Sequence, residues 1–195
     1  MEPFPSIVTE RLELRLVAQA DATALRGFRG HPDAVRYLSH QPLTARQTDR
    51  LLAQLLVRAE RSTADWFHYA WAVVLRSTGT VIGDARTWNS AEPPLPGGIP
   101  ADFASLGYLL HPDHHGRGYG SEAAGALVRW LFTERGTNAI YAGVYEPNTA
   151  SRRLLEGLGF VQDHYFTAAQ DTHGKGLASW RYRLDRAAWP LVEDD

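Results

Sequence analysis

The chain has 195 residues, of which 44% are hydrophobic and 22% charged, and its formal net charge is −2. These values argue against disorder and indicate one globular domain spanning 1–195 with a sizeable core. A charge so close to zero also argues against a nucleic-acid partner, which would require a strongly basic face. The sequence has no cysteine, which excludes disulfides, a thiolate zinc site and a cysteine nucleophile.

No apolar run reaches the roughly 18 residues of a membrane span, and the N-terminal region lacks the apolar core of a signal peptide. We therefore expect a soluble, cytoplasmic protein without a membrane partner.

The N-terminal part predicts one strand and two helices. Residues 11–17 alternate between charged and apolar side chains, which is typical of a strand with one face in water. Asp21 is expected to cap a first helix that ends near Gly30. Thr44 is expected to cap a longer helix, since leucines recur at helical spacing over 51–59.

Residues 67–75 and 80–88 are rich in aromatic and β-branched side chains, and the short turn between them predicts a β-hairpin. The segment 89–103 that follows is rich in proline and glycine and has no periodicity, so we expect a loop. A loop of this length is typically a lid, a binding loop or an inert bulge, and the sequence leaves these alternatives open.

Further elements are expected after this loop: a strand at 105–110, a helix from 122, a strand at 139–145, a helix over 149–157, and a closing strand pair at 160–167 and 177–184. Strands and helices in this mixture predict a layered α/β fold with a mainly antiparallel sheet of about seven strands. The six tryptophans are interpreted as mostly core or sheet-face residues, and Trp88, just before the long loop, is a candidate for an acceptor pocket.

The glycine-rich stretch 114–123 lies between a predicted strand and a predicted helix. Free backbone N–H groups at the start of a helix bind phosphate well, and glycine avoids a Cβ that would hold the anion away. The P-loop requires a lysine that is absent here, and the dinucleotide fingerprint has a different glycine spacing. A phosphate-bearing ligand is the leading hypothesis, and a simple connection between elements is the alternative.

A second motif occupies residues 146–160, where Asn148 and Ser151 lie three apart in the first turn of a predicted helix. Taken alone, Asn148 is better explained as a helix cap, and Ser151 as an exposed residue of the first turn. The two motifs in this order resemble those of the GNAT superfamily of acetyltransferases, most narrowly its RimJ/RimL branch. The opening 9–12, Thr-Glu-Arg-Leu, resembles that branch too, and the likeness extends over 9–184.

The resemblance implies a sheet that is splayed between its fourth and fifth strands, here 106–110 and 139–145. It also implies acetyl-CoA as cosubstrate and no metal. The acceptor would be the amine of a protein N-terminus or of a small molecule, its wall would include the first helices, and a homodimer would be in keeping with the family. The residues expected to bind the cofactor, in the loop, at the end of the preceding strand and in the second motif, are Leu109, Leu110, His115, Gly116, Arg117, Gly118, Tyr119, Gly120, Ser121, Asn148 and Ser151.

Within that loop, His115 departs from the glutamine or arginine usual at its first position. The amides of Leu109 and Leu110 are candidate oxyanion donors. Many family members place a tyrosine seven residues after the asparagine, where this chain has Leu155. In the RimL-like pattern a serine three residues after the asparagine takes its place, so Ser151 is expected to donate a proton to the leaving thiolate while Asn148 positions the cofactor.

The general base is left open by the sequence. Glu146 is the first candidate, followed by Asp84 and His68, and each is also explained as a structural or solvated residue. An α-amine has a pKa of about 8, so a water chain is a further alternative. The histidines at 111, 114 and 115 lie in a turn and are interpreted as loop residues without a metal. A non-catalytic acyl-CoA-binding module, or transfer of a longer acyl group, remains an alternative to acetyl transfer.

Overall fold

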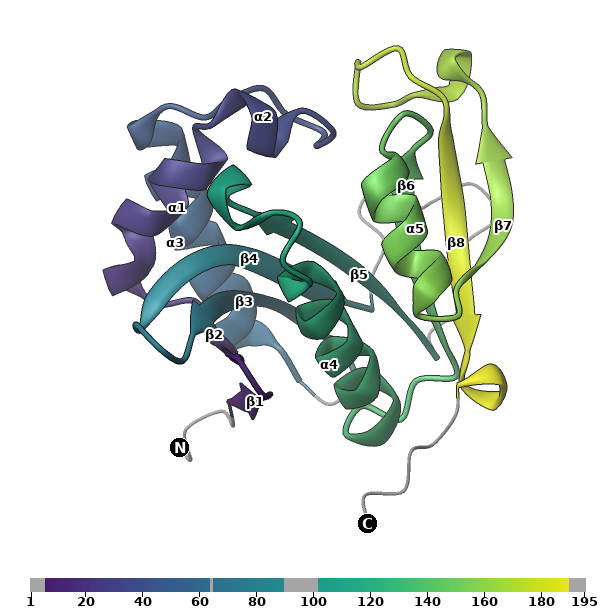
Figure 1. Ribbon diagram of the computed structural model, residues 1–195, viewed down its shortest axis with the longest axis horizontal. Helices are drawn as coiled ribbons and strands as arrows, with labels where there is room; N and C mark the ends of the chain where they lie inside the picture. The colour runs from purple at the N-terminus through teal and green to yellow at the C-terminus, as the bar shows by residue number, and fades with distance from the viewer. Residues whose placement is uncertain (1–5, 64, 90–101, 190–195) are drawn as a thin grey trace.

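The computed structural model describes residues 6–63, 65–89 and 102–189. In this part of the chain one sheet runs in the order β1-β2-β3-β4-β5-β6-β8-β7 (Figure 1). Neighbouring strands are antiparallel, except that β5 and β6 are parallel. The strands are β1 (Ile7–Val8), β2 (Leu12–Leu16), β3 (His68–Leu75), β4 (Thr80–Trp88), β5 (Phe103–Leu110), β6 (Ala139–Tyr145), β7 (Val161–Phe166) and β8 (Ser179–Asp185).

The predicted mixed α/β fold is confirmed, with eight strands in the described residues where about seven were expected. The additional strand is β1, whose two residues are too few to show a period and are ordered by pairing with β2. The strand expected from 105 begins at Phe103, so the loop prediction for 89–103 fails at its end. Residues 90–101 of that predicted loop lie outside the described chain.

The helices cover both faces of the sheet. In Figure 1, α4 crosses one face of β3–β5, and α3 lies against the other. Leucines of α4 belong to the same buried cluster as the odd-numbered residues of β3, and residues of α1 and α3 belong to the cluster that contains its even-numbered residues. The helices are α1 (Ala22–Arg29), α2 (Pro32–Val35), α3 (Ala45–Arg61), α4 (Tyr119–Thr133) and α5 (Thr149–Gly157).

Of the two predicted helix caps, the structure confirms Thr44 but not Asp21. Thr44 caps α3 as expected, in a capping box in which its hydroxyl accepts the Gln47 amide at 3.3 Å. Asp21 occupies the cap position of α1 but makes no capping hydrogen bond. Its carboxylate instead accepts two hydrogen bonds at 2.8 Å from Arg15. The capping prediction for Asp21 is therefore wrong, because Asp21 ends a 3-10 turn with a helical backbone and its carboxylate accepts from Arg15 and from the Ala18 N–H instead.

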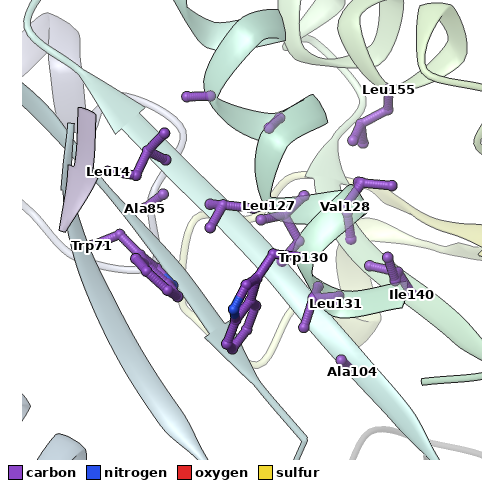
Figure 2. Close-up of a cluster of buried hydrophobic side chains, with 14 of the residues drawn as sticks. Leu14, Trp71, Ala85, Ala104, Leu127, Val128, Trp130, Leu131, Ile140 and Leu155 are labelled. Carbon is purple, nitrogen blue, oxygen red and sulfur yellow. The ribbon is translucent and has the colours of Figure 1, made fainter. Parts of the chain in front are cut away.

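Two tryptophans form the centre of the core beneath α4. Figure 2 shows the rings of Trp71 and Trp130 side by side between β3 and α4; their centroids are 4.9 Å apart in an edge-to-face arrangement with an interplanar angle of 74°. The Trp71 indole N–H donates to the Thr87 hydroxyl at 3.0 Å, so its polar atom is satisfied although the residue is fully buried. The predicted core role of these two tryptophans is confirmed.

The sheet divides between β5 and β6. The two strands pair only along Phe103–Ser105 and Ala139–Tyr141, and their remaining residues have no partner across this seam. The expected splay is therefore present, and from Leu106 onward one edge of β5 faces a gap in the hydrogen-bonding of the sheet.

Candidate functional site

The glycine turn before α4 has the geometry of an anion-binding nest. Gly116 and Gly118 have φ angles of 72° and 80°, a left-handed conformation that disfavours other residues. Gly118 is the N-cap of α4, and the first backbone bond of the helix runs from the Glu122 N–H to the Gly118 carbonyl. Helix geometry therefore leaves the N–H groups of Tyr119, Gly120 and Ser121 without intrahelical acceptors.

The turn is fastened to the start of the chain through Glu122. The Glu122 carboxylate accepts hydrogen bonds from the Thr9 hydroxyl at 2.6 Å and from Arg11 Nε at 2.6 Å. Arg11 also donates from Nη1 to the Arg117 carbonyl at 2.9 Å. Burial opposes ionisation of Glu122, but these hydrogen bonds outweigh it and lower its pKa. The motif over 9–12 thus has a structural role, since it holds the turn in position.

Two side chains of the loop have different roles. The His115 ring contacts the Leu110 carbonyl through Nε2 at 3.0 Å and so ties the loop to the end of β5. Arg117 is exposed, and its guanidinium has no ion-pair partner within the described chain. Of these two predicted residues, Arg117 is the one whose side chain is available to an anionic ligand.

The strand direction distinguishes the two predicted oxyanion donors. The His111 N–H donates to the Ile82 carbonyl on β4, and successive amides of a strand point in opposite directions. The Leu110 amide therefore points away from β4 toward the open edge, and the Leu109 amide points toward β4. The structure favours Leu110 as the donor and gives Leu109 no access to the seam.

Ser151 forms a hydrogen bond with Tyr108, a residue that the sequence analysis did not predict to be in the site. Its Oγ lies 2.7 Å from the Tyr108 hydroxyl, and either group can donate. Tyr108 comes from β5 and Ser151 from the first turn of α5, so this hydrogen bond spans the divided seam. The Asn148 side chain accepts the Ser151 N–H at 3.2 Å, so it does cap α5. No local pattern marks Tyr108, because its partner lies on another element.

The Tyr108 hydroxyl is held in its protonated form. Burial raises the pKa of Tyr108 to about 12, although the hydrogen bond with Ser151 opposes this shift. At neutral pH the pair therefore consists of two uncharged hydroxyls at the seam, able to donate a hydrogen bond to an anion that develops beside them.

A cavity of about 100 Å³ lies where β5 and β6 separate. One wall comes from β5 and another from β6, the N-terminus of α5 closes one end, and the segment after α2 covers the remaining side. Both members of the hydroxyl pair line it. The lining residues are Tyr37, Leu38, Leu106, Gly107, Tyr108, Ala142, Gly143, Val144, Asn148, Ser151 and Leu155.

The three candidate bases do not line this cavity. The Glu146 carboxylate is exposed and accepts a hydrogen bond from Tyr165 at 3.3 Å. Asp84 is 1% exposed and forms an ion pair with Arg29. Burial lowers the pKa of His68 to about 4, helped by nearby arginines, so this ring is neutral but weakly basic. The structure brings none of them to the hydroxyl pair.

The histidines after β5 stabilise a turn. The His111 ring accepts the Asp113 N–H at 3.3 Å. No group of three or more metal-ligating side chains occurs within residues 6–63, 65–89 and 102–189. Over the same ranges, no helix has both the length and the apolar character required to cross a membrane.

Taken together, these features define an α/β protein with a divided mixed sheet, a glycine turn at a helix N-terminus and a polar seam beside it. Residues 11–161 match the family described as acetyltransferase (GNAT) domain. This match covers more than half of the chain, which therefore belongs to the GNAT family of acetyltransferases.

Known relatives agree with this assignment. An uncharacterized N-acetyltransferase, p20, of Bacillus licheniformis is 26% identical over 92% of this chain and 95% of its own. Among solved structures, a ribosomal-protein-S5-alanine acetyltransferase from Vibrio fischeri superposes with a TM-score of 0.76 at 19% identity, covering 95% of this chain and 99% of that one. Spermidine N-acetyltransferase from Vibrio cholerae, in complex with CoA and spermine, gives 0.74 at 15% identity, with 92% and 98% covered. At these identities the two structures show a common fold.

Proposed function

We propose that this protein transfers an acetyl group from acetyl-CoA to a primary amine by direct attack within a ternary complex. The observation that carries the proposal is the hydrogen bond between Tyr108 and Ser151 across the divided seam, next to the glycine turn. It places neutral proton donors beside the cavity into which a carrier bound at that turn would extend.

The residues of the turn fit a diphosphate. Two left-handed glycines and the first amides of α4 present N–H groups at the positive end of the helix dipole. Arg117 adds an exposed cation on the same loop. The open edge of β5 supplies the Leu110 amide for a developing oxyanion, an interaction worth about 3 kcal/mol when such a donor is preformed.

The residues at the seam supply a proton donor for the thiolate, and water serves as the base for the amine. In this proposal Ser151 donates a hydrogen bond to the departing thiolate, Tyr108 supports it, and Asn148 fixes the turn that carries Ser151. Glu146 stays a candidate base only at the rim, because it lies outside the cavity lining. An α-amine with a pKa of about 8 is partly neutral at physiological pH, so ordered water suffices.

We place the chain near the RimJ/RimL branch because of Ser151 and the opening at 9–12, which here holds the glycine turn in position. The acceptor on this proposal is the amine of a protein N-terminus or of a small molecule. A homodimer that shares the acceptor cleft is part of the same proposal and is testable by sedimentation.

The test is thiol release from acetyl-CoA in the presence of a panel of peptides and small amines. Release that depends on an acceptor supports the proposal. Tight binding without release from any acceptor would instead indicate a non-catalytic acyl-CoA-binding module. A series of acyl-CoA chain lengths separates acetyl transfer from transfer of a longer acyl group.

A further inference from the structure

Arg86 is a partly buried cation, and two of its guanidinium nitrogens are left without a hydrogen bond among the residues that the structure describes. It follows Asp84 by two positions on β4, so it points to the face of the sheet covered by α1 and α3, opposite the glycine turn. Its Nε and Nη2 atoms are shielded from solvent and have no hydrogen-bond partner within the described chain. Most buried polar groups are hydrogen-bonded, so an unpaired guanidinium here requires an explanation.

The nearest carboxylate is already occupied. Asp84 accepts hydrogen bonds from Arg29 Nε at 3.0 Å and from Arg29 Nη2 at 2.6 Å. Burial lowers the pKa of Arg86 to about 10, and the charge of Arg29 adds to that effect while Asp84 opposes it. Arg86 therefore stays protonated at neutral pH, but in surroundings that already contain a second arginine.

The pKa values of two nearby histidines are lowered by burial and by nearby positive charges. Burial is the main cause that lowers the pKa of both His40 and His68, and the charge of Arg86 lowers each one further. Arg58 adds to the effect on His68, and Lys175 adds to that on His40. The Lys175 ammonium reaches the His40 carbonyl at 3.2 Å, so the segment before β8 meets the segment after α2 over this face.

This cationic region adjoins the cavity at the seam. Gly107, which lines the cavity, is the cross-strand neighbour of Arg86 in the register of β4 and β5. A Cβ added at Gly107 would meet only the Trp88 ring, at 3.7 Å. The Trp88 ring therefore lies over Gly107, and it is the register of β4 and β5 that places Arg86 next to the strand lining the cavity. Tyr37 and Leu38 line the cavity just before His40 in the chain.

We propose that the acceptor carries an anionic group, a carboxylate or a phosphate, that binds Arg86 on the α1–α3 face while its amine enters the cavity at Gly107. This inference rests on the proposed acetyl transfer and narrows its acceptor to amines with a nearby negative charge. The same region repels polycationic acceptors, because their ammonium groups would approach Arg29, Arg86 and Lys175 together.

The experiment measures kcat/KM with matched acceptors that differ only in the anionic group. Phenylalanine is compared with phenethylamine for a carboxylate, phosphoethanolamine with ethanolamine for a phosphate, and a peptide with glutamates at its second and third positions with its glutamine counterpart. Spermidine serves as the polycation. The variants are Arg86→Met, which removes the charge, Arg86→Lys, which keeps it, and Arg26→Met, a control whose arginine pairs with Asp49 at the surface.

We expect at least one anionic acceptor to exceed its neutral partner by about tenfold or more in the wild type, since one charge pair in a partly buried site is worth that much. Arg86→Met should abolish the preference with little change for the neutral partner, Arg86→Lys should keep part of it, and Arg26→Met should keep all of it. Equal use of neutral and anionic acceptors, preference for spermidine, or a preference unchanged in Arg86→Met would overturn the inference and leave acetyl transfer standing. Acetyl-CoA binding without transfer to any acceptor would overturn both.

Discussion

Replacing Gly118 by alanine tests the anion-binding turn. Gly118 has φ 80° and ψ −2° at the N-cap of α4, and an added Cβ would lie 3.2 Å from Arg11 Nη2. A residue other than glycine costs about 1–2 kcal/mol in this conformation. The arginine end can shift by a few tenths of an ångström, so the backbone dominates the cost. If the turn relaxes toward negative φ, its N–H groups no longer converge on one anion.

The expected loss of affinity for acetyl-CoA follows from the number of hydrogen bonds to the diphosphate that the variant cannot make. A hydrogen bond to a charged group contributes about 1.5–3 kcal/mol, so losing one or two weakens acetyl-CoA binding by roughly 10- to 100-fold or more. The matched control is Gly125→Ala in the interior of α4, where the new Cβ would lie at an ordinary 3.5 Å from the Leu158 side chain. Alanine there should bind acetyl-CoA normally and raise stability by up to about 1 kcal/mol.

Titration calorimetry with two ligands makes this test specific. Acetyl-CoA carries the diphosphate, whereas S-acetylpantetheine lacks it and should bind the wild type and Gly118→Ala with similar affinity. An equal loss for both ligands would refute the reasoning, because it would show general damage to the fold. An unchanged affinity for acetyl-CoA would refute it as well, because the turn would then not bind the diphosphate.

Three further outcomes are expected. Tyr108→Phe removes the hydrogen-bond partner of Ser151 and should lower kcat by about tenfold or more with little change in KM. The control Tyr165→Phe loses only a hydrogen bond to the exposed Glu146 and should leave kcat unchanged. If both variants had the same kcat, Tyr108 would have no role in the reaction. Asp84→Ala leaves Arg29 buried without its carboxylate partner and should lower the free energy of unfolding by about 3–5 kcal/mol. Asp49→Ala removes a surface ion pair and should lower it by about 1 kcal/mol or less. Similar melting temperatures for the two variants would contradict this prediction. The pKa of His68 is lowered from 6.5 to about 4, so between these pH values the unfolded chain binds more protons than the folded protein. The free energy of unfolding should therefore rise with pH across this range, and it should rise less in His68→Leu. An equal rise in that variant would contradict the lowered pKa of His68.

The sequence predicted those parts of the site that depend on local geometry. The glycine turn at 116–120 and the cap at Asn148 each require particular residues at fixed spacing, and both occur where expected. The division of the sheet between β5 and β6 came from the family resemblance, because no local pattern marks where two strands cease to pair.

Contacts between distant elements were beyond the reach of local patterns. Tyr108 and Ser151 are 43 residues apart, and Thr9 and Glu122 are 113 apart, so neither pair leaves a periodic signal. Asp84 has the residue type of a general base, but burial beside Arg29 commits its carboxylate to an ion pair. Asp21 shows a related effect at a helix start, where its backbone is already helical and an arginine of β2 donates to its carboxylate oxygens.

The most direct test of the account is a crystal structure of the protein with acetyl-CoA. We predict that the diphosphate accepts hydrogen bonds of about 3 Å from the backbone amides of the turn at 116–121, and that the sulfur lies in the seam beside the hydroxyls of Tyr108 and Ser151. A diphosphate bound elsewhere, with these amides facing solvent and the Tyr108–Ser151 pair remote from the sulfur, would contradict it.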